Sequence, residues 1–115
     1  MSRRDPGVRL RHMLLYTREA LELSRGRTRA DLDTDRMLNL ALTRLLEIIG
    51  EAAARVPPET KTTLPGIPWP EIVGLRNRLI HGYDNVNFDI LWAILVDDLP
   101  VLIAELERVV TGDRQ

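Results

Sequence analysis

The chain has 115 residues, of which 44% are apolar and 29% charged, a balance that favours a folded core and argues against a disordered chain. This length gives room for one domain, which we expect over residues 1–115. The absence of cysteine excludes disulfides, thiolate nucleophiles and cysteine-type zinc sites, and the net charge of −1 argues against coating nucleic acid through the overall field.

The sequence contains no targeting or membrane signal. No stretch approaches the roughly 18 continuous apolar residues that a membrane span requires, and residues 1–8 are not followed by the apolar segment of a signal peptide. We therefore expect a soluble protein without membrane contact. The lack of cysteine adds a preference for a reducing, cytoplasmic compartment.

A first helix is expected to begin with Asp5 as N-cap and Pro6 in the first turn, and to end near Gly26. Residues 1–29 hold eight arginines against three acids, whereas residues 84–115 hold seven acids against two arginines. A basic first helix could face phosphate groups. The alternative, which the weakness of charge runs as signals favours, is a solvated face whose arginines pair with acids elsewhere.

Three further helices complete the prediction. Residues 37–54 are apolar on most sides, as in a central or interface helix, and the proline-rich residues 56–70 indicate a structured loop. A third helix is expected from Pro70 to a stop at Gly82, and a fourth from its cap at Asn87 to the C-terminus, kinked or split at Pro100. No strand pattern competes. The sequence therefore predicts an all-α protein, an antiparallel four-helix bundle.

The third helix carries an anomaly at Arg76. Helical spacing puts Arg76 near the centre of the apolar face, and Tyr83 would lie there too. A guanidinium in such a stripe costs several kcal/mol of lost hydration unless it is paired, and Glu47 and Glu51 on the second helix are the nearest candidates. A buried arginine–glutamate pair that only fixes helix register explains the pattern as well as a functional site does. The apolar residues of this face are Ile72, Val73, Leu75, Leu79 and Ile80.

His81 does not share a face with Arg76 if the helix stays regular. It would lie roughly 140° around the axis, on the side of Asn77. Either the helix distorts before Gly82, or a second subunit supplies the missing half of a site. Taken alone, a histidine near a helix C-terminus is more often a capping or surface residue, because the helix dipole favours imidazolium there.

The segment from Arg76 to Tyr83 reads Arg-x4-His-x-Tyr and resembles the signature of the HEPN superfamily, specifically the HepT-like toxins. The likeness spans nearly the whole chain beyond the first thirty residues. It includes Leu46 to Ala53 in the second helix, Ile67-Pro68-Trp69, Leu91-Trp92 and Asp98-Leu99-Pro100.

This resemblance implies a HEPN-like helical-bundle homodimer in which two copies of the motif line a cleft at the interface. It implies metal-independent endoribonuclease activity on RNA, with no cofactor. It also implies a partner, an MntA-like nucleotidyltransferase antitoxin that transfers AMP onto the motif tyrosine, here Tyr83.

The chemistry of these residues agrees with that activity. Cleavage of RNA without a metal needs a base for the 2′-hydroxyl, donors for the charged phosphorane and an acid for the leaving oxygen. His81 titrates in the useful range, and the Arg76 guanidinium matches phosphate oxygens, so these two are the expected catalytic residues. Asn77, Arg78 and Tyr83 are expected to bind substrate. The sequence offers no dense carboxylate cluster for two metal ions.

An alternative of another class shares the same fold. In this reading the protein is a non-catalytic helical adaptor or regulatory dimer that binds a nucleotidyltransferase, and Arg76 makes only a structural salt bridge. Cleavage assays on the wild type and on His81→Ala, with EDTA present, separate the two, because the adaptor predicts no cleavage by either protein.

Overall fold

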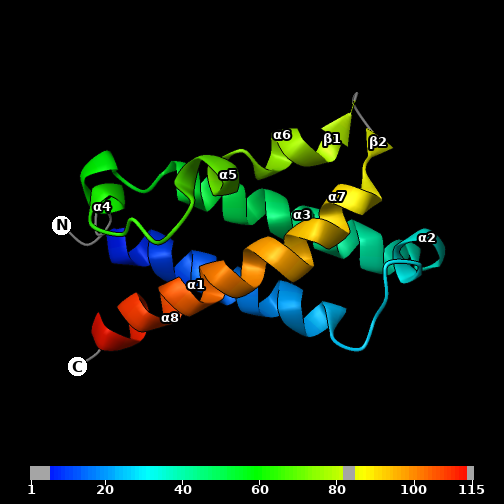
Figure 1. Ribbon diagram of the computed structural model, residues 1–115, viewed down its shortest axis with the longest axis horizontal. Coiled ribbons are helices and arrows are strands. Elements are labelled where there is room, and N and C mark those ends of the chain that lie inside the picture. The colour runs from blue at the N-terminus through cyan, green and yellow to red at the C-terminus, as the bar shows by residue number, and fades with distance from the viewer. Residues whose placement is uncertain (1–5, 82–84, 114–115) are drawn as a thin grey trace.

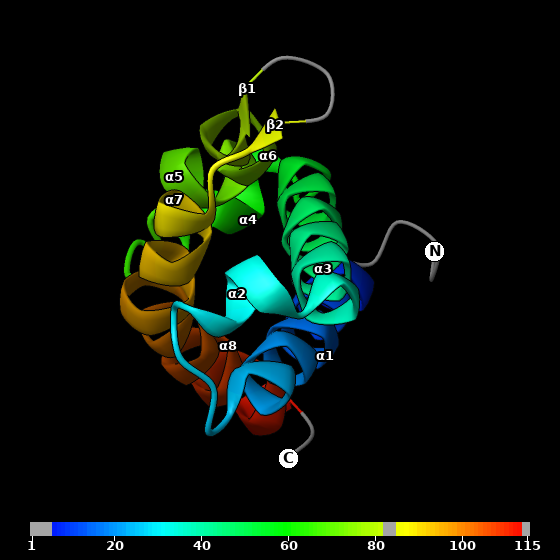
Figure 2. The same cartoon turned by 90° about the vertical axis from the view of Figure 1, so that its right-hand side faces the viewer.

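The computed structural model describes residues 6–81 and 85–113. Over these residues the protein is a bundle of helices, and the all-α prediction is confirmed (Figure 1). Three long helices, α1 (Pro6–Ser24), α3 (Arg36–Ala54) and α8 (Leu99–Asp113), form most of it. The shorter α5 (Trp69–Val73) and α6 (Leu75–Leu79) lie together along a fourth side, as the end view shows (Figure 2). No helix of the described part is long and apolar enough to cross a membrane.

The N-terminal half follows the predicted helices closely. The first helix begins at Pro6 and ends at Ser24, two residues before Gly26, whose φ of +73° suits a glycine in the turn; its predicted cap, Asp5, lies outside the described residues. The polar connection contains a short helix that was not predicted, α2 (Asp31–Thr34). This helix is held against the core by Leu32, which is fully buried. Asp35 then caps α3, its side chain accepting a hydrogen bond from the Leu38 backbone N–H at 3.0 Å.

The proline-rich loop is ordered by local contacts, as predicted. It contains the short helix α4 (Pro58–Thr62), and it is anchored by Trp69, which is 8% exposed. The indole N–H of Trp69 donates a hydrogen bond to the Leu64 carbonyl at 3.1 Å. The indole satisfies its one donor in this way and fixes the point where α5 begins.

The third helix differs from its prediction. It is divided at Gly74 into α5 and α6 and ends at Leu79, three residues before Gly82. The next residues form a small antiparallel hairpin, β1 (Ile80–His81) and β2 (Asn85–Val86), so the prediction of no strand was wrong. Glycine disfavours a helix, which accounts for the division at Gly74. Ile80 and Val86 pair across the hairpin, and both are β-branched residues that favour a strand.

The last helix is interrupted next to Pro100. It starts as α7 (Phe88–Ala93), capped as predicted by Asn87, whose side chain accepts from the Ile90 N–H at 3.1 Å. A π-helical turn, η2 (Ile94–Asp98), then joins α7 to α8. Proline removes one helical hydrogen bond and crowds the carbonyl four residues earlier, and a widened turn relieves that crowding. The predicted split of this helix is therefore confirmed, with its form now defined.

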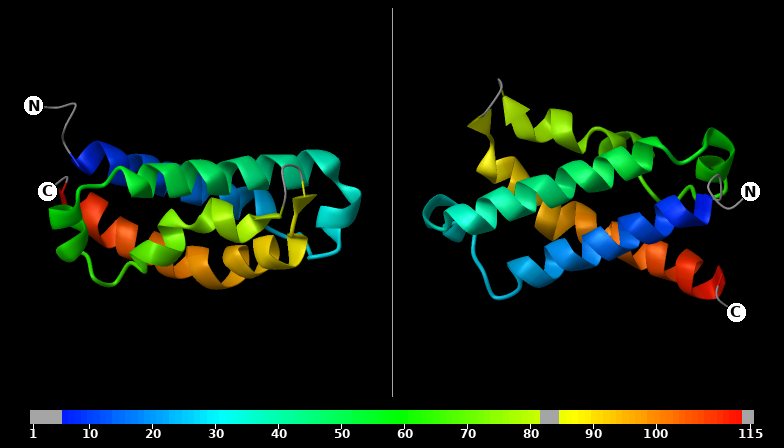
Figure 3. Two further views of the ribbon diagram at one scale, coloured as in Figure 1. Left: turned by 90° about the horizontal axis from the view of Figure 1, so that it is seen from above. Right: turned by 180° about the vertical axis from the view of Figure 1, so that it is seen from behind.

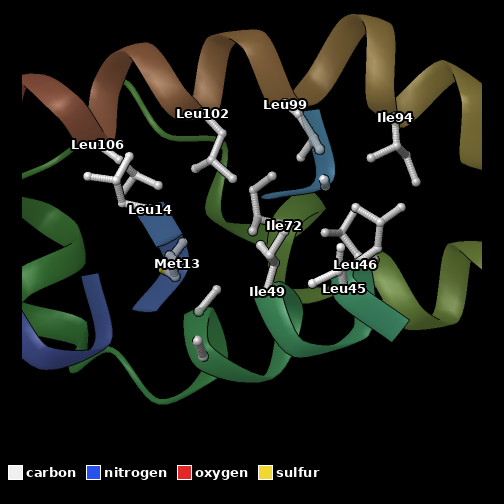
Figure 4. Close-up of a cluster of buried hydrophobic side chains, with 14 of the residues drawn as sticks. Met13, Leu14, Leu45, Leu46, Ile49, Ile72, Ile94, Leu99, Leu102 and Leu106 are labelled. Atoms are coloured by element: carbon white, nitrogen blue, oxygen red, sulfur yellow. The ribbon is translucent and has the colours of Figure 1, made fainter. Parts of the chain in front are cut away.

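The core lies between α1, α3, α5 and α8, where apolar side chains converge from all four helices (Figure 4). Ile49 and Ile72 bring α3 and α5 together, and both are fully buried. The burial of such side chains supplies the main stabilisation of the bundle. Other fully buried members of the cluster are Met13, Leu46, Ile94, Leu99, Leu102 and Leu106.

Candidate active site

Helix α3 forms a ridge on one face of the bundle, between α1 on one side and α6 with the hairpin on the other (Figure 3, right). Two grooves lie between α3 and the part of the chain from α5 to α7, residues 69–81 and 85–93, which we call the motif segment. The first, of about 190 Å³, has walls from α3, α5 and α6, and we call it the motif groove. Its lining includes Glu47, Gly50, Glu51, Val73, Arg76 and Asn77.

The second groove, of about 480 Å³, lies between the first half of α3 and the hairpin, and we call it the hairpin groove. Glu47 lines both grooves, so they meet at this carboxylate. Ile80 of β1 and Asn85 of β2 form part of the opposite wall. The motif segment therefore borders two adjoining hollows along α3.

Gly50 allows the motif segment to approach α3 closely. A Cβ at this position would lie 3.1 Å from the Ile72 carbonyl oxygen and 3.5 Å from that of Val73. Both of these neighbours are backbone atoms, which move less readily than a side-chain end. The glycine in the middle of α3, which its helical propensity disfavours, is thus explained by the packing of α5.

Arg76 is exposed, so the prediction of a guanidinium buried in an apolar stripe is wrong. Its side chain is 60% exposed, and its Nε lies 3.9 Å from Oε2 of Glu47, too far for a hydrogen bond. The buried face of this segment is narrower than predicted and consists of Ile72, Leu75 and Leu79, since Val73 is 38% exposed. Arg76 lies at the edge of that stripe and borders the motif groove, where its donors remain available to a phosphate.

The two predicted glutamates differ in role. Glu47 is 17% exposed and lies between two arginines, with Oε1 3.3 Å from Arg44 and Oε2 near Arg76. Glu51 is exposed and makes no ion pair within the described residues. Glu47 is therefore the partner of Arg76, although the contact is loose and half-solvated.

Asn77 and Arg78, both predicted to bind substrate, point to different surroundings. Asn77 is exposed and lines the motif groove beside Arg76. Arg78 instead donates a hydrogen bond to Asp98 in η2 at 2.8 Å, and both side chains are partly buried. This ion pair ties α6 to the last helix, and a contact of Arg78 with substrate stays a prediction.

The backbone carries His81 out of the helix. Because α6 ends at Leu79, His81 lies in β1, paired with Asn85 of β2, and the helical angle of 140° between Arg76 and His81 does not apply. The hairpin is held to the helix by a hydrogen bond from the Asn87 N–H to the Leu79 carbonyl at 2.9 Å. Of the two remedies predicted, distortion of the helix end is thus observed. Tyr83 lies outside the described residues, and the structure describes only the backbone of His81.

The basic N-terminal region is largely paired with acids, as the solvated-face interpretation predicted. Arg18 contacts Glu107 at 3.2 Å, and Arg25, Arg27 and Arg29 each contact at least one carboxylate within 3.2 Å. The hydrogen bond that Arg29 donates to the Asp89 carboxylate raises the pKa of Arg29 above its ordinary value.

Two residues of the site were missed by sequence reasoning. Arg44, three positions before Glu47, holds the other oxygen of that carboxylate, and its spacing on the helix could have predicted the contact. Asp98 meets Arg78 across twenty positions of sequence, and only the π-helical turn brings it there. No local signal predicts such a contact.

Comparison with known proteins gives a consistent result. The family model described as "Ribonuclease HepT-like" matches residues 13–109. A protein of Methanocaldococcus jannaschii named as an RNase is 35% identical over 95% of this chain and its own full length. One of Caldanaerobacter subterraneus subsp. tengcongensis, also named as an RNase, is 32% identical over 96% of this chain and 99% of its own. A protein of Thermococcus cleftensis named as ribonuclease HepT is 38% identical over 78% and 86%. No solved structure gives a significant match.

Proposed function

Because the chain belongs to the HepT-like ribonuclease family, we propose that it is a metal-independent endoribonuclease toxin that cleaves RNA at the motif groove. The observation that carries this proposal is the exposed Arg76 beside Glu47 in a groove, with His81 following in the hairpin. The structural alternative predicted from the sequence was an arginine buried in the bundle and closely hydrogen-bonded to its acid. Arg76 is neither.

In the proposed reaction the 2′-hydroxyl oxygen attacks the adjacent phosphorus, and the bond from phosphorus to the 5′-oxygen breaks. One imidazole takes the 2′-hydroxyl proton, and a second imidazolium gives a proton to the leaving 5′-oxygen. The products are a 2′,3′-cyclic phosphate and a 5′-hydroxyl end, and no further reactant is needed. Arg76 stabilises the charge that develops on the phosphorane oxygens. Asn77, at the groove wall, orients the substrate as a neutral donor.

Each chain supplies a single motif histidine, His81, so two motif imidazoles require two chains, and we propose that the protein acts as a homodimer. Met37 is 82% exposed and Leu40 is 51% exposed, and both lie in the first half of α3, where Leu40 lines the hairpin groove. Apolar side chains so exposed are suited to contact with a second copy. Contact through this end of α3 would bring the two hairpins toward a common cleft. We expect the wild type to have the mass of a dimer in solution and Met37→Glu to have half that mass.

The regulation we propose is AMP transfer onto Tyr83 by an MntA-like nucleotidyltransferase antitoxin. A nucleotide on the tyrosine would place a bulky anion near Arg76 and oppose binding of an RNA phosphate. Incubation of the protein with the antitoxin and ATP should add AMP, detected by mass spectrometry. The label should be absent from Tyr83→Phe, and labelling that persists on that variant excludes Tyr83 as the acceptor.

The decisive experiment is RNA cleavage with EDTA present, by the wild type and by variants of the motif. His81→Ala and Arg76→Ala should each lower the rate by about a hundredfold or more, the size of a general acid–base or oxyanion contribution. Arg18→Gln serves as the matched control and should cleave as the wild type does, because it removes an exposed arginine whose ion pair with Glu107 lies outside both grooves. Equal and absent cleavage by all of these proteins would favour the adaptor, in which the Arg76–Glu47 contact is structural.

A further inference from the structure

A third groove lies on the other side of α3, between the start of α1 and the end of α3, and we call it the α1–α3 groove. It has a volume of about 200 Å³, and Arg9, His12 and Tyr16 of α1 line it together with Glu51 of α3 and Arg55, which directly follows α3. The rings of His12 and Tyr16 lie edge to face, with centroids 6.4 Å apart. The groove therefore combines two guanidiniums with two aromatic rings.

The arginines of this groove differ from two other arginines of the N-terminal region, Arg18 and Arg25. Arg18 in α1 and Arg25, which directly follows α1, are each ion-paired with a glutamate. Arg9 and Arg55 make no ion pair with any residue among 7–80 and 85–110, the part of the chain whose side chains the structure describes. A guanidinium without an acidic partner keeps its charge and its five donors for an anionic ligand.

The position of the groove links it to the motif. Glu51 lines both the motif groove and the α1–α3 groove, so the two are separated by the width of one helix, about 10 Å. Met37 lies at the other end of α3, about 27 Å from Arg55 along the axis. A second copy seated on Met37 and Leu40 is therefore compatible with an open α1–α3 groove.

We infer that the α1–α3 groove binds single-stranded RNA next to the segment cleaved in the motif groove. Arg9 and Arg55 contact phosphates, and Tyr16, with His12 beside it, stacks on a base. Cationic side chains that follow the backbone and aromatic rings that take the bases are the combination by which proteins hold single strands. An acidic protein segment would use the arginines but would gain nothing from the rings. The inference rests on the proposed ribonuclease function and names a second contact for its substrate.

The test measures binding of a fluorescent single-stranded RNA to the full chain carrying His81→Ala, which prevents cleavage, over a range of salt concentrations. The double variant Arg9→Gln with Arg55→Gln should lower affinity about tenfold or more at low salt. It should also reduce the slope of log affinity against log salt by about 1.4, or 0.7 for each phosphate that is no longer neutralised. The matched control is Arg18→Gln with Arg25→Gln, two exposed arginines in and directly after α1 that are already paired, and it should change both values much less.

Tyr16 gives an independent readout. Tyr16→Leu should lower affinity about fivefold or more with the salt slope unchanged, whereas Tyr16→Phe keeps the ring and should bind as the parent does. In cleavage assays with His81 restored, the arginine variant should raise KM for a long RNA and leave kcat unchanged, because it removes binding that substrate and transition state share.

The possible failures are distinct. Unchanged affinity and slope in the Arg9/Arg55 variant would overturn the inference, while cleavage by the wild type would leave the proposed function intact. Unchanged RNA binding with loss of the complex with the antitoxin nucleotidyltransferase would also overturn it and would identify a protein-binding groove. Wild-type protein that neither binds nor cleaves RNA would remove the proposed function itself.

Discussion

The long helices and the segment that carries the motif are built in different ways. Helices α1 and α3 each run for 19 residues without interruption. Between residues 69 and 93, in contrast, the chain forms α5, α6, two strands and α7, each only two to six residues long. The long helices supply the frame, and the short elements shape the motif groove and the hairpin groove. Changes in the frame should therefore affect the whole protein, and changes in the motif segment should act locally.

The largest expected effect comes from the frame. Leu46 lies in α3 and is fully buried, so Leu46→Ala leaves a cavity in the core. We expect the free energy of unfolding to fall by about 3 kcal/mol, as for other buried leucines. Chemical denaturation at fixed protein concentration measures it. Val101→Ala on α8, where the side chain is 50% exposed, is the control, and an equal loss of stability in both would contradict the assigned core.

A smaller effect is expected where the frame meets the motif segment. Gly50→Val places a branched side chain against the carbonyl oxygens of α5, and overpacking of this kind costs about 2 kcal/mol. Hydrogen exchange should show faster exchange in α5 and α6 than in the wild type. Ala54→Val, on an exposed position of the same helix, should leave exchange in these elements unchanged. Equal exchange rates in the two variants would mean that the packing of α5 does not depend on its close approach to α3 at Gly50.

The contrast between long helices and short elements also explains which parts of the fold could be predicted from the sequence. Helical periodicity located α1 and α3 to within two residues, because a long apolar stripe leaves few alternatives. It failed at Arg76, since the angles were counted along one helix that in fact breaks at Gly74. Short elements are fixed by tertiary contacts, which local patterns do not record.

The candidate site was predictable in part. The spacing of Arg76 and His81 marked the right segment, and Glu47 was among the two carboxylates expected near Arg76. The pairing of Arg78 with Asp98 was not predictable, because it depends on the π-helical turn and on the packing of α6 against the last helix. The sequence thus identifies which residues belong to the motif. Which of them line a groove and which make structural contacts can be read only from the fold.

The Arg78–Asp98 pair offers the third test of the comparison. Asp98→Asn weakens a hydrogen-bonded ion pair whose arginine is 34% exposed and whose aspartate is 18% exposed, so solvent screening limits the loss of stability to about 1 kcal/mol. The local effect should be larger: amide exchange in residues 75–81 should rise while that in α1 and α3 stays unchanged. Asp97→Asn, the exposed neighbour, should alter neither. Faster exchange throughout the bundle would show that the motif segment is not a separate cooperative unit.

The smallest effect, and the one with a defined pH dependence, is expected at the start of α3. The hydrogen bond from the Leu38 N–H lowers the pKa of Asp35 below its ordinary value. A carboxyl group whose pKa is lowered by folding stabilises the folded state above its unfolded pKa, about 3.9, and that contribution is lost as the pH falls through the folded pKa. Asp35→Ala should therefore lower the melting temperature slightly at pH 7 and not at the lowest pH at which the protein is folded. Asp35→Asn keeps the capping oxygen without the charge, so it should remain nearly as stable as the wild type at pH 7 and lose less stability on acidification. If both variants followed the wild type at every pH, the cap would contribute nothing, and the beginning of α3 would have to be fixed by the burial of Leu38 and Leu42 alone.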